Sequence, residues 1–255
     1  MTVRRAPRIR LIPILLALVV LLAALNGILL VVKPLLKPGV PASGQILYAS
    51  GFEDSASPEW EQYRSAVTAQ LADGRLSLIA DSAKDNIFAP LAYTFRDFDL
   101  RVAARQTFGE DPFSEYGVLF RYQDKRNFYI FRVRSDGSYR VSRAIDGKQE
   151  DLSTNTDPER FRSPLAVGLN WMNDLRIVAK GDRFQFYING QQLTLCPKGS
   201  DKRSTWDGER CVSNGGQTAL ELVDSTFADG RIALSIYENT EKVAVDFDNL
   251  VMIAP

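Results

Sequence analysis

The sequence has 255 residues and contains no histidine. This absence excludes Ser-His-Asp and Cys-His nucleophile systems, the usual zinc sites and proton shuttles built on imidazole. No glycine-rich phosphate loop follows a strand and opens a helix, and no Walker-type lysine is present, so a P-loop nucleotide site is not expected. An enzyme built on this chain would have to rely on carboxylates, tyrosine or lysine.

Acidic residues are absent from the first 52 positions, because the first one is Glu53. Six of the 31 basic residues precede it, so the rest of the chain carries 25 basic residues against 31 acidic ones. Binding to nucleic acid requires a positive surface that displaces counterions from the phosphates. The acidic balance of this region therefore argues against a nucleic-acid partner.

Charge is also absent from the 22 residues between Leu11 and Val32. At about 1.5 Å per residue, a helix of this length spans the roughly 30 Å of a bilayer core. Four arginines lie in residues 1–10, whereas only Lys33 and Lys37 follow the apolar run. This asymmetry predicts a cytoplasmic N-terminus and an extracytoplasmic remainder.

We therefore expect a single-pass protein of the cell membrane. It has a basic cytoplasmic tail (1–10), a transmembrane helix (11–32) and a stiff stalk rich in proline and glycine (33–45). A cleaved signal peptide is the alternative, with a small-residue site at Val40-Pro41-Ala42. The apolar part of a signal peptide is usually shorter, about 7 to 15 residues, which favours the anchor.

Residues 46–255 read as short runs with a period of two, and no helical stripe of about 15 residues interrupts them. Asp-Gly or Asn-Gly dipeptides, which are typical of tight hairpin turns, separate several of these runs and begin at Asp73, Asp136, Asp146, Asn189 and Asp229. The pattern predicts an all-β fold, an antiparallel two-sheet jelly-roll sandwich. The expected strands are 75–80, 99–106, 116–123, 128–134, 139–145, 174–181, 183–190, 231–238 and 244–253.

Alternation along the strands assigns their faces. In 99–106 we expect Leu100, Val102 and Ala104 to face the core. In 128–134 both faces begin apolar, which predicts a central strand covered on both sides. Arg132 is expected to emerge where that cover stops.

The order of the motifs resembles a known family. "GFED...W", "DGRLSL", "YGVLFRYQDKRNFYIFRVRSDGSYRV", "NDLRIVAKGDRFQFYINGQQL" and the closing "VAVDFDNLVMI" are similar to the concanavalin A-like lectin/glucanase superfamily, in particular to its laminin-G-like and glycosidase-related bacterial domains. The resemblance implies two antiparallel sheets with sugars bound on a concave face. It also implies paired carboxylates in the enzymes of the family, but the glucanase pattern Glu-x-Asp-x-x-Glu is absent, which argues against catalysis.

Acidic residues near the chain's two terminal strands suggest a metal site. Asp246 and Asp248 in "DFDNL" share one strand face, and Asp54 belongs to the opposite terminal strand. Oxygen ligands of this kind suit a structural calcium ion. The alternative, which we favour, is that these residues only satisfy backbone donors at strand ends.

Cys196 and Cys211 flank a polar insertion and are the only cysteines. Outside the membrane, such a pair is expected to form a disulfide rather than a metal site or a catalytic thiol. Trp206 lies within the insertion. Its ring either contacts a sugar or a protein, or packs as the small core of the loop, and the sequence favours neither.

Arg121, Arg132 and Arg143 lie on neighbouring expected strands at positions that the alternation places outward. Together with Tyr187 and Tyr237 they form a hypothetical ligand site, since arginine pairs with acidic groups and aromatic rings stack on sugars. The simpler interpretation is that exposed strand positions commonly carry arginine and tyrosine.

Two classes of function follow. The first is a membrane-anchored, extracytoplasmic, non-catalytic binding module for carbohydrate or another cell-envelope polymer, with a domain that docks an envelope protein as a variant. The second is a membrane-anchored carbohydrate-active enzyme of the glycosidase or lyase type. The missing glucanase carboxylates favour binding.

Overall fold

The computed structural model describes residues 41–64, 67–80, 86–109, 114–134, 136–155, 164–199, 206–207, 210–237 and 242–255. Ser43–Pro255 form one compact unit. The segment expected to span the membrane lies outside the described residues. Among the residues that are described, no helix has the length and apolar character needed to cross a bilayer. The anchor therefore stays a prediction.

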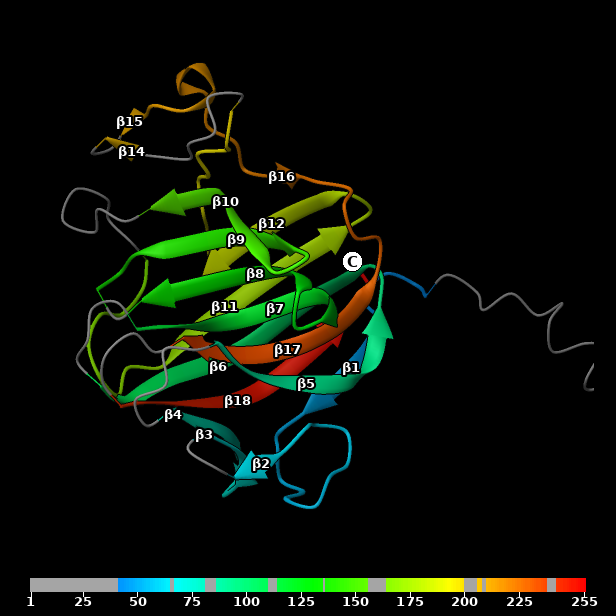
Figure 1. Cartoon of the computed structure of the whole chain (residues 1–255). Helices are drawn as coiled ribbons and strands as arrows, with labels where there is room; N and C mark the ends of the chain where they lie inside the picture. Colours follow the sequence, from blue (N-terminus) through cyan, green and yellow to red (C-terminus); the bar gives the residue numbers. More distant parts are fainter. Residues whose placement is uncertain are drawn as a thin grey trace, which may run out of the picture. The chain divides into compact units, whose positions relative to one another are not determined.

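Two antiparallel sheets face each other in this unit (Figure 1). The larger runs in the order β13 (Gln191–Gln192), β12 (Arg183–Ile188), β11 (Asn173–Lys180), β6 (Phe98–Phe108), β18 (Val243–Ile253), β4 (Arg75–Ala80), β3 (Val67–Ala72) and β2 (Tyr63–Arg64), with β1 (Ile46–Ser50) paired to β18 and β16 (Leu222–Val223) to β12. The six-stranded sheet runs in the order β10 (Lys148–Asn155), β9 (Tyr139–Ile145), β8 (Asn127–Arg134), β7 (Glu115–Asp124), β17 (Gly230–Tyr237) and β5 (Asn86–Phe95). The expected all-β, antiparallel two-sheet sandwich is confirmed.

A third, two-stranded sheet, β14 (Trp206–Asp207) and β15 (Arg210–Cys211), projects beyond β10 at the top of Figure 1. A single 3-10 turn, η1 (Asn214–Gly216), follows it. All nine expected strands are present, with their ends shifted by at most two residues. The sequence pattern did not predict β1, β3, β5 and β10, nor the strands of two residues.

Aromatic side chains fill the space between the two sheets. Phe120 of β7 lies 5.2 Å from Phe184 of β12, measured between ring centroids. Leu100, Val102 and Ala104 of β6 are buried, as the alternation predicts. Each fully buried large apolar side chain contributes about 1.5 to 3 kcal/mol. Packing of the two inner faces is thus the main force that holds the sandwich together.

The other face of the six-stranded sheet is also apolar near its middle. A second buried cluster forms there from Phe88, Leu119, Tyr122, Phe128, Ile130, Ala144 and Ala233. Strand β8 contributes Tyr129 and Phe131 to the central core and Phe128 and Ile130 to this second cluster. The prediction that this strand is covered on both sides is confirmed.

The dipeptide turns differ from one another. At Asp73-Gly74, Asp146-Gly147 and Asn189-Gly190 both residues have positive φ, as tight hairpin turns require. At Asp136-Gly137 only the glycine does, with φ of 97°. The loop there is longer: it closes at the hydrogen bond that the Arg134 amide donates to the Ser138 carbonyl (3.0 Å). Asp136-Gly137 therefore does not form the tight hairpin turn that the dipeptide predicts.

Candidate functional site

A cleft of about 340 Å³ opens at one edge of the sandwich. Its size falls within the range of small-ligand sites, roughly 300 to 1,000 Å³. The lining comes from β1, the loop that follows it, β3 and β5. The lining residues are Ser50, Phe52, Asp54, Ser57, Pro58, Glu59, Trp60, Leu71 and Tyr93.

The loop after β1 is held in place by the edge strand β5. Trp60 forms an antiparallel bridge with Leu91. On either side of it, the Ala92 amide donates to the Glu59 carbonyl (2.7 Å) and the Glu61 amide donates to the Pro90 carbonyl (3.0 Å). The loop thereby covers the free edge of the six-stranded sheet, which would otherwise present unpaired backbone groups. This pairing places Glu59 beside Tyr93.

The Glu59 carboxylate is oriented by two tyrosine hydroxyls. Tyr93 donates to Oε1 (2.7 Å) and Tyr48 donates to Oε2 (3.0 Å). The Trp60 indole N–H donates in turn to the Tyr48 hydroxyl (3.0 Å). An ionised carboxylate has about four acceptor positions, so each oxygen keeps capacity for a ligand. The chain of donors fixes the carboxylate before any ligand arrives.

Both tyrosines remain hydroxyl donors at neutral pH. Burial is the main factor that raises the pKa of Tyr48, to about 12. The hydrogen bond to Glu59 is the main factor that raises the pKa of Tyr93. Neither phenol ionises near neutrality, so both donors to Glu59 persist over the physiological pH range.

Aromatic rings surround this carboxylate, and one of them is open to solvent. Tyr48 lies 5.9 Å from Tyr93 and 6.4 Å from Trp60 between ring centroids. Phe52 and Trp60 are buried, whereas Tyr93 is 47% exposed. Tyr93 is therefore the ring of this group on which a ligand can stack.

Solved structures share this sandwich. The carbohydrate-binding module CBM66 from Bacillus subtilis superposes with a TM-score of 0.53 at 16% identity, over 79% of this chain and 99% of the module. A protein of unknown function with a galectin-like fold, also from Bacillus subtilis, gives 0.56 at 9% identity, over 84% of this chain and 97% of its own. The catalytic domain of an endo-1,3-beta-glucanase (laminarinase) from Thermotoga petrophila RKU-1 gives 0.52 at 8% identity, over 83% and 98%.

The described unit has a concanavalin A-like fold. The resemblance read from the sequence motifs is confirmed at this level. At such low identities the similarity establishes the fold and no activity. No family model matches the sequence, and neither does any curated protein.

Arg121 does not face outward, so that expectation was wrong. The register of β7 against β8 shifts after Phe120, and Arg121 adopts a left-handed backbone conformation with φ of 49°. This bulge turns the side chain inward, where it is 1% exposed. The guanidinium donates to the Phe227 carbonyl (2.6 Å) and to the Gly181 carbonyl, and it stacks 4.8 Å from the centre of the Phe184 ring. Arg121 ties loops together at one end of the sandwich.

Arg132 is also buried, contrary to expectation, and is 2% exposed. It lies 3.6 Å from the Glu115 carboxylate, which Arg134 (3.0 Å) and Arg140 (3.5 Å) also approach. Burial lowers the pKa of Arg132 to about 10, against the opposing effect of Glu115. The small pocket beside this group, which we call the Glu115 cluster (Glu115, Arg132, Arg134, Arg140), has no room for a water-sized molecule. The Glu115 cluster is therefore part of the scaffold.

Arg143 forms ion pairs with two acidic residues of its own domain. Its guanidinium donates to Asp224 (2.6 Å), to Glu150 (2.8 Å) and to the Thr226 hydroxyl (2.8 Å). These partners bring together β9, β10 and the loop after β16. The three arginines of the sequence hypothesis therefore do not converge on one surface.

The two tyrosines of the hypothesis lie in different sheets. Tyr187 belongs to β12 in the larger sheet, where its hydroxyl donates to Gln185 (2.8 Å) and Arg176 lies 4.6 Å from its ring centre. Tyr237 ends β17 in the six-stranded sheet and carries Arg132 at 5.6 Å from its ring centre. They cannot line a common site, and a binding role for either stays a prediction.

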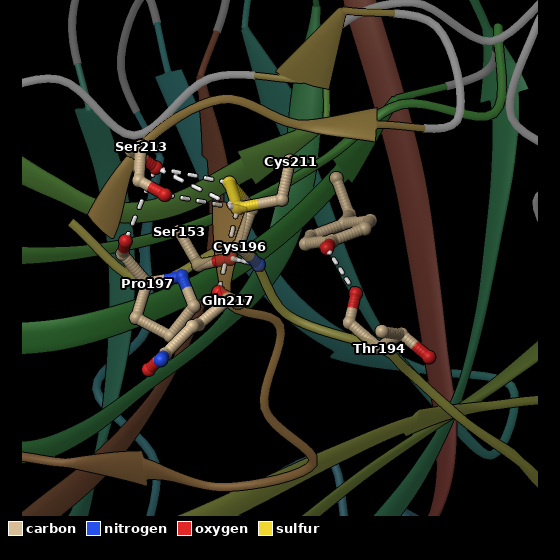
Figure 2. Close-up of a disulfide and its surroundings, with 8 residues drawn as sticks. Ser153, Thr194, Cys196, Pro197, Cys211, Ser213 and Gln217 are labelled. Carbon is tan, nitrogen blue, oxygen red and sulfur yellow. Dashed lines mark hydrogen bonds between the residues drawn. A yellow bond between two sulfur atoms is a disulfide. The ribbon is translucent and has the colours of Figure 1, made fainter. Parts of the chain in front are cut away.

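Cys196 and Cys211 form the expected disulfide (Figure 2). Both residues are buried, and the Ser213 hydroxyl lies 3.0 Å from the Cys196 sulfur. Trp206 pairs with Cys211 across the β14–β15 ladder. It is partly buried, its indole nitrogen is shielded from solvent, and it lies next to Tyr139. This contact favours the alternative in which Trp206 packs down as part of the loop's own core.

The acids proposed for calcium have other partners. Asp246 accepts hydrogen bonds from Ser77 (2.7 Å), Arg105 (3.0 Å) and Arg75 (3.2 Å). Asp54 accepts from the Ala56 amide (3.0 Å) and Asp248 from the Asn249 amide (2.7 Å). Within the described ranges, no three metal-ligating side chains gather into a group. The calcium site stays a prediction.

The sequence alone did not predict the edge cleft. Glu59 and Tyr93 are 34 residues apart, and β5, which carries Tyr93, was not among the expected strands. The stretch "GFED...W" was noted only as part of the family resemblance. The signal that could have found the site is its composition, since residues 46–63 combine aromatic and acidic side chains with no lysine or arginine.

Proposed function

We propose that this protein is a membrane-anchored, extracytoplasmic carbohydrate-binding module and that the edge cleft is its sugar site. The observation that carries the proposal is the Glu59 carboxylate, fixed by Tyr48 and Tyr93 at the wall of an open cleft. The fold supports it, because a carbohydrate-binding module and a glucanase domain share the same sandwich. The anchor rests on residues 11–32 of the sequence alone.

Sugars present two kinds of surface to a protein. Their C–H faces stack on aromatic rings, and their hydroxyls donate to carboxylates. In the cleft the exposed ring of Tyr93 supplies the first contact and Glu59 and Asp54 supply the second. Because Glu59 is oriented in advance, little entropy is lost on binding.

The experiment is a glycan-array screen of residues 43–255, the compact unit that carries its own core. Hits are then titrated by calorimetry with the parent, with Tyr93→Ala and with Glu59→Gln. We expect at least one hit whose binding both substitutions weaken about tenfold. Arg143→Lys is the matched control outside the cleft. Absence of any hit, or hits that neither cleft substitution weakens, would refute the proposal.

Catalysis is the second candidate function, because Asp54 and Glu59 line the same cleft and glycosidases use two carboxylates. The absent glucanase pattern argues against it. Incubation of each array hit with the parent protein, followed by analysis for released reducing ends or unsaturated products, decides between the two. Product formation that is lost in Glu59→Gln would establish an enzyme.

A further inference from the structure

The edge cleft differs in its charge from the other acidic sites of the domain. Elsewhere, buried and partly buried carboxylates are matched by arginine: Asp99 lies 2.7 Å from Arg176, and Asp224 lies 2.6 Å from Arg143. Glu59 is also partly buried, but its side-chain partners among the described residues are the hydroxyls of Tyr48 and Tyr93. Its negative charge has no cationic partner in the described part of the chain.

The surroundings of the cleft add to this negative potential. Asp54 lines it as well, and none of the nine lining residues is lysine or arginine. The stretch that builds most of it, residues 46–63, holds four acidic residues and no basic one. Charges partly removed from water interact more strongly than charges in bulk solvent, so a cation gains more here than on the open surface.

An aromatic wall suits a cation too. Three rings line the cleft, the exposed Tyr93 and the buried Phe52 and Trp60. The faces of such rings attract ammonium groups. An ammonium also has three donors, which match the free acceptor positions on Glu59 and Asp54.

We propose that the sugar bound in the edge cleft is an amino sugar with a free, protonated amine. This inference rests on the proposed function and narrows it to a class of ligand. The amine pairs with Glu59 and Asp54, while the C–H face of the same ring stacks on Tyr93. An acetylated amine has no charge, so a sugar unit that carries one loses the ionic contact with Glu59 and Asp54 and keeps only the stacking on Tyr93.

The test uses two oligosaccharides that differ only in that charge, namely glucosamine oligomers and N-acetylglucosamine oligomers of equal length. Both are titrated into residues 43–255 by calorimetry at low salt and again at about 0.5 M salt. We expect the free amine form to bind at least about tenfold more tightly at low salt, since a hydrogen bond to a charged group contributes about that factor. Screening by salt shrinks the difference.

Variants separate the cleft from the overall charge of the domain. Glu59→Gln keeps the shape of the side chain and is expected to remove most of the preference, and Asp54→Asn part of it. Asp54 is exposed, so its variant keeps the test valid even where Glu59→Gln folds poorly. Asp174→Asn, on the exposed face of β11, removes one negative charge outside the cleft and is expected to leave the preference unchanged.

Each outcome is informative. Equal or tighter binding of the acetylated oligomers, with loss in Tyr93→Ala, overturns the amino-sugar inference and leaves the proposed sugar site intact. A tetralysine peptide that binds as tightly as the glucosamine oligomers also overturns it, because the cleft then recognises any amine. Failure to bind either oligomer, with no hit on the array, overturns the proposed function together with the inference.

Discussion

The Tyr93 hydroxyl donates a 2.7 Å hydrogen bond to the Glu59 carboxylate, although the two residues are 34 positions apart in the sequence. Tyr93 lies on the edge strand of one sheet, and Glu59 lies in the loop that covers this edge. The contact therefore depends on a loop that has folded back onto β5. It joins the acidic and the aromatic parts of the edge cleft.

Substitutions at Tyr93 are expected to affect binding and not folding. Tyr93→Ala removes the exposed ring and should weaken binding of an array hit by up to about tenfold. Tyr93→Phe keeps the ring, loses the hydrogen bond to Glu59 and should have a smaller effect. Calorimetric titration measures both. Alanine and phenylalanine variants that bind like the parent would place the sugar elsewhere.

The Glu115 cluster is expected to govern stability instead. Arg132→Ala removes the most deeply buried arginine of the cluster, leaves the buried Glu115 with two more exposed partners and should destabilise the fold by about 3 to 5 kcal/mol. Arg140→Ala is the control, since that side chain is 27% exposed and its loss should cost less than about 1 kcal/mol. Urea unfolding provides the measurement. Equal effects of the two substitutions would show that the cluster does not depend on its buried member.

The disulfide is expected to persist in the exported protein and to support the insertion between β13 and β16. Replacing Cys196 and Cys211 together by serine should reduce the free energy of unfolding by about 3 kcal/mol, because a loop of about 15 residues is then unrestricted in the unfolded chain. Thermal unfolding tests this. Mass analysis without reduction should find the linked peptides in the native protein, and two free thiols would contradict both the bond and the expected location.

Asp246 is expected to make the domain sensitive to acid. Burial alone raises its pKa, but hydrogen bonds from Ser77, Arg105 and Arg75 outweigh burial and hold the pKa below its ordinary value of about 3.9. The stabilisation is complete above this ordinary value and is lost as the pH falls through the lowered pKa. Urea unfolding between pH 5 and pH 2 should show a smaller loss of stability in Asp246→Asn than in the parent. Identical pH profiles would contradict the assignment.

The apolar run of residues 11–32 is expected to remain in the mature protein with the sandwich outside the cell membrane. Protease treatment of intact cells should release a fragment that begins within the stalk, residues 33–45. Sequencing the N-terminus of the native protein is the second measurement. A mature N-terminus at Ser43 would establish cleavage after Ala42 instead.

Much of the sandwich could be predicted from local sequence. The faces of β6, the two-sided cover of β8 and the tight hairpin turns at Asp73 and Asn189 all follow from side-chain alternation or from the φ preference of Asp-Gly and Asn-Gly pairs. The disulfide could be predicted because the chain has only two cysteines. The strand faces and turns depend on residues close in sequence. The disulfide depends on a pairing for which two cysteines leave only one possibility.

Only the tertiary structure decided which charged residues are free to bind. Alternation placed Arg121 outward, but a bulge changes the count of residues along β7 and reverses the direction of its side chain. Arg132 was expected to emerge where the apolar cover of its strand stops, but its carboxylate partner, Glu115, lies on the neighbouring strand, and both residues are buried. The edge cleft forms where the loop after β1 pairs with β5, and no local sequence pattern predicts this pairing. Strand faces follow from a two-residue period, whereas ion pairs and clefts depend on which distant segments become neighbours, and packing of the whole chain sets that choice.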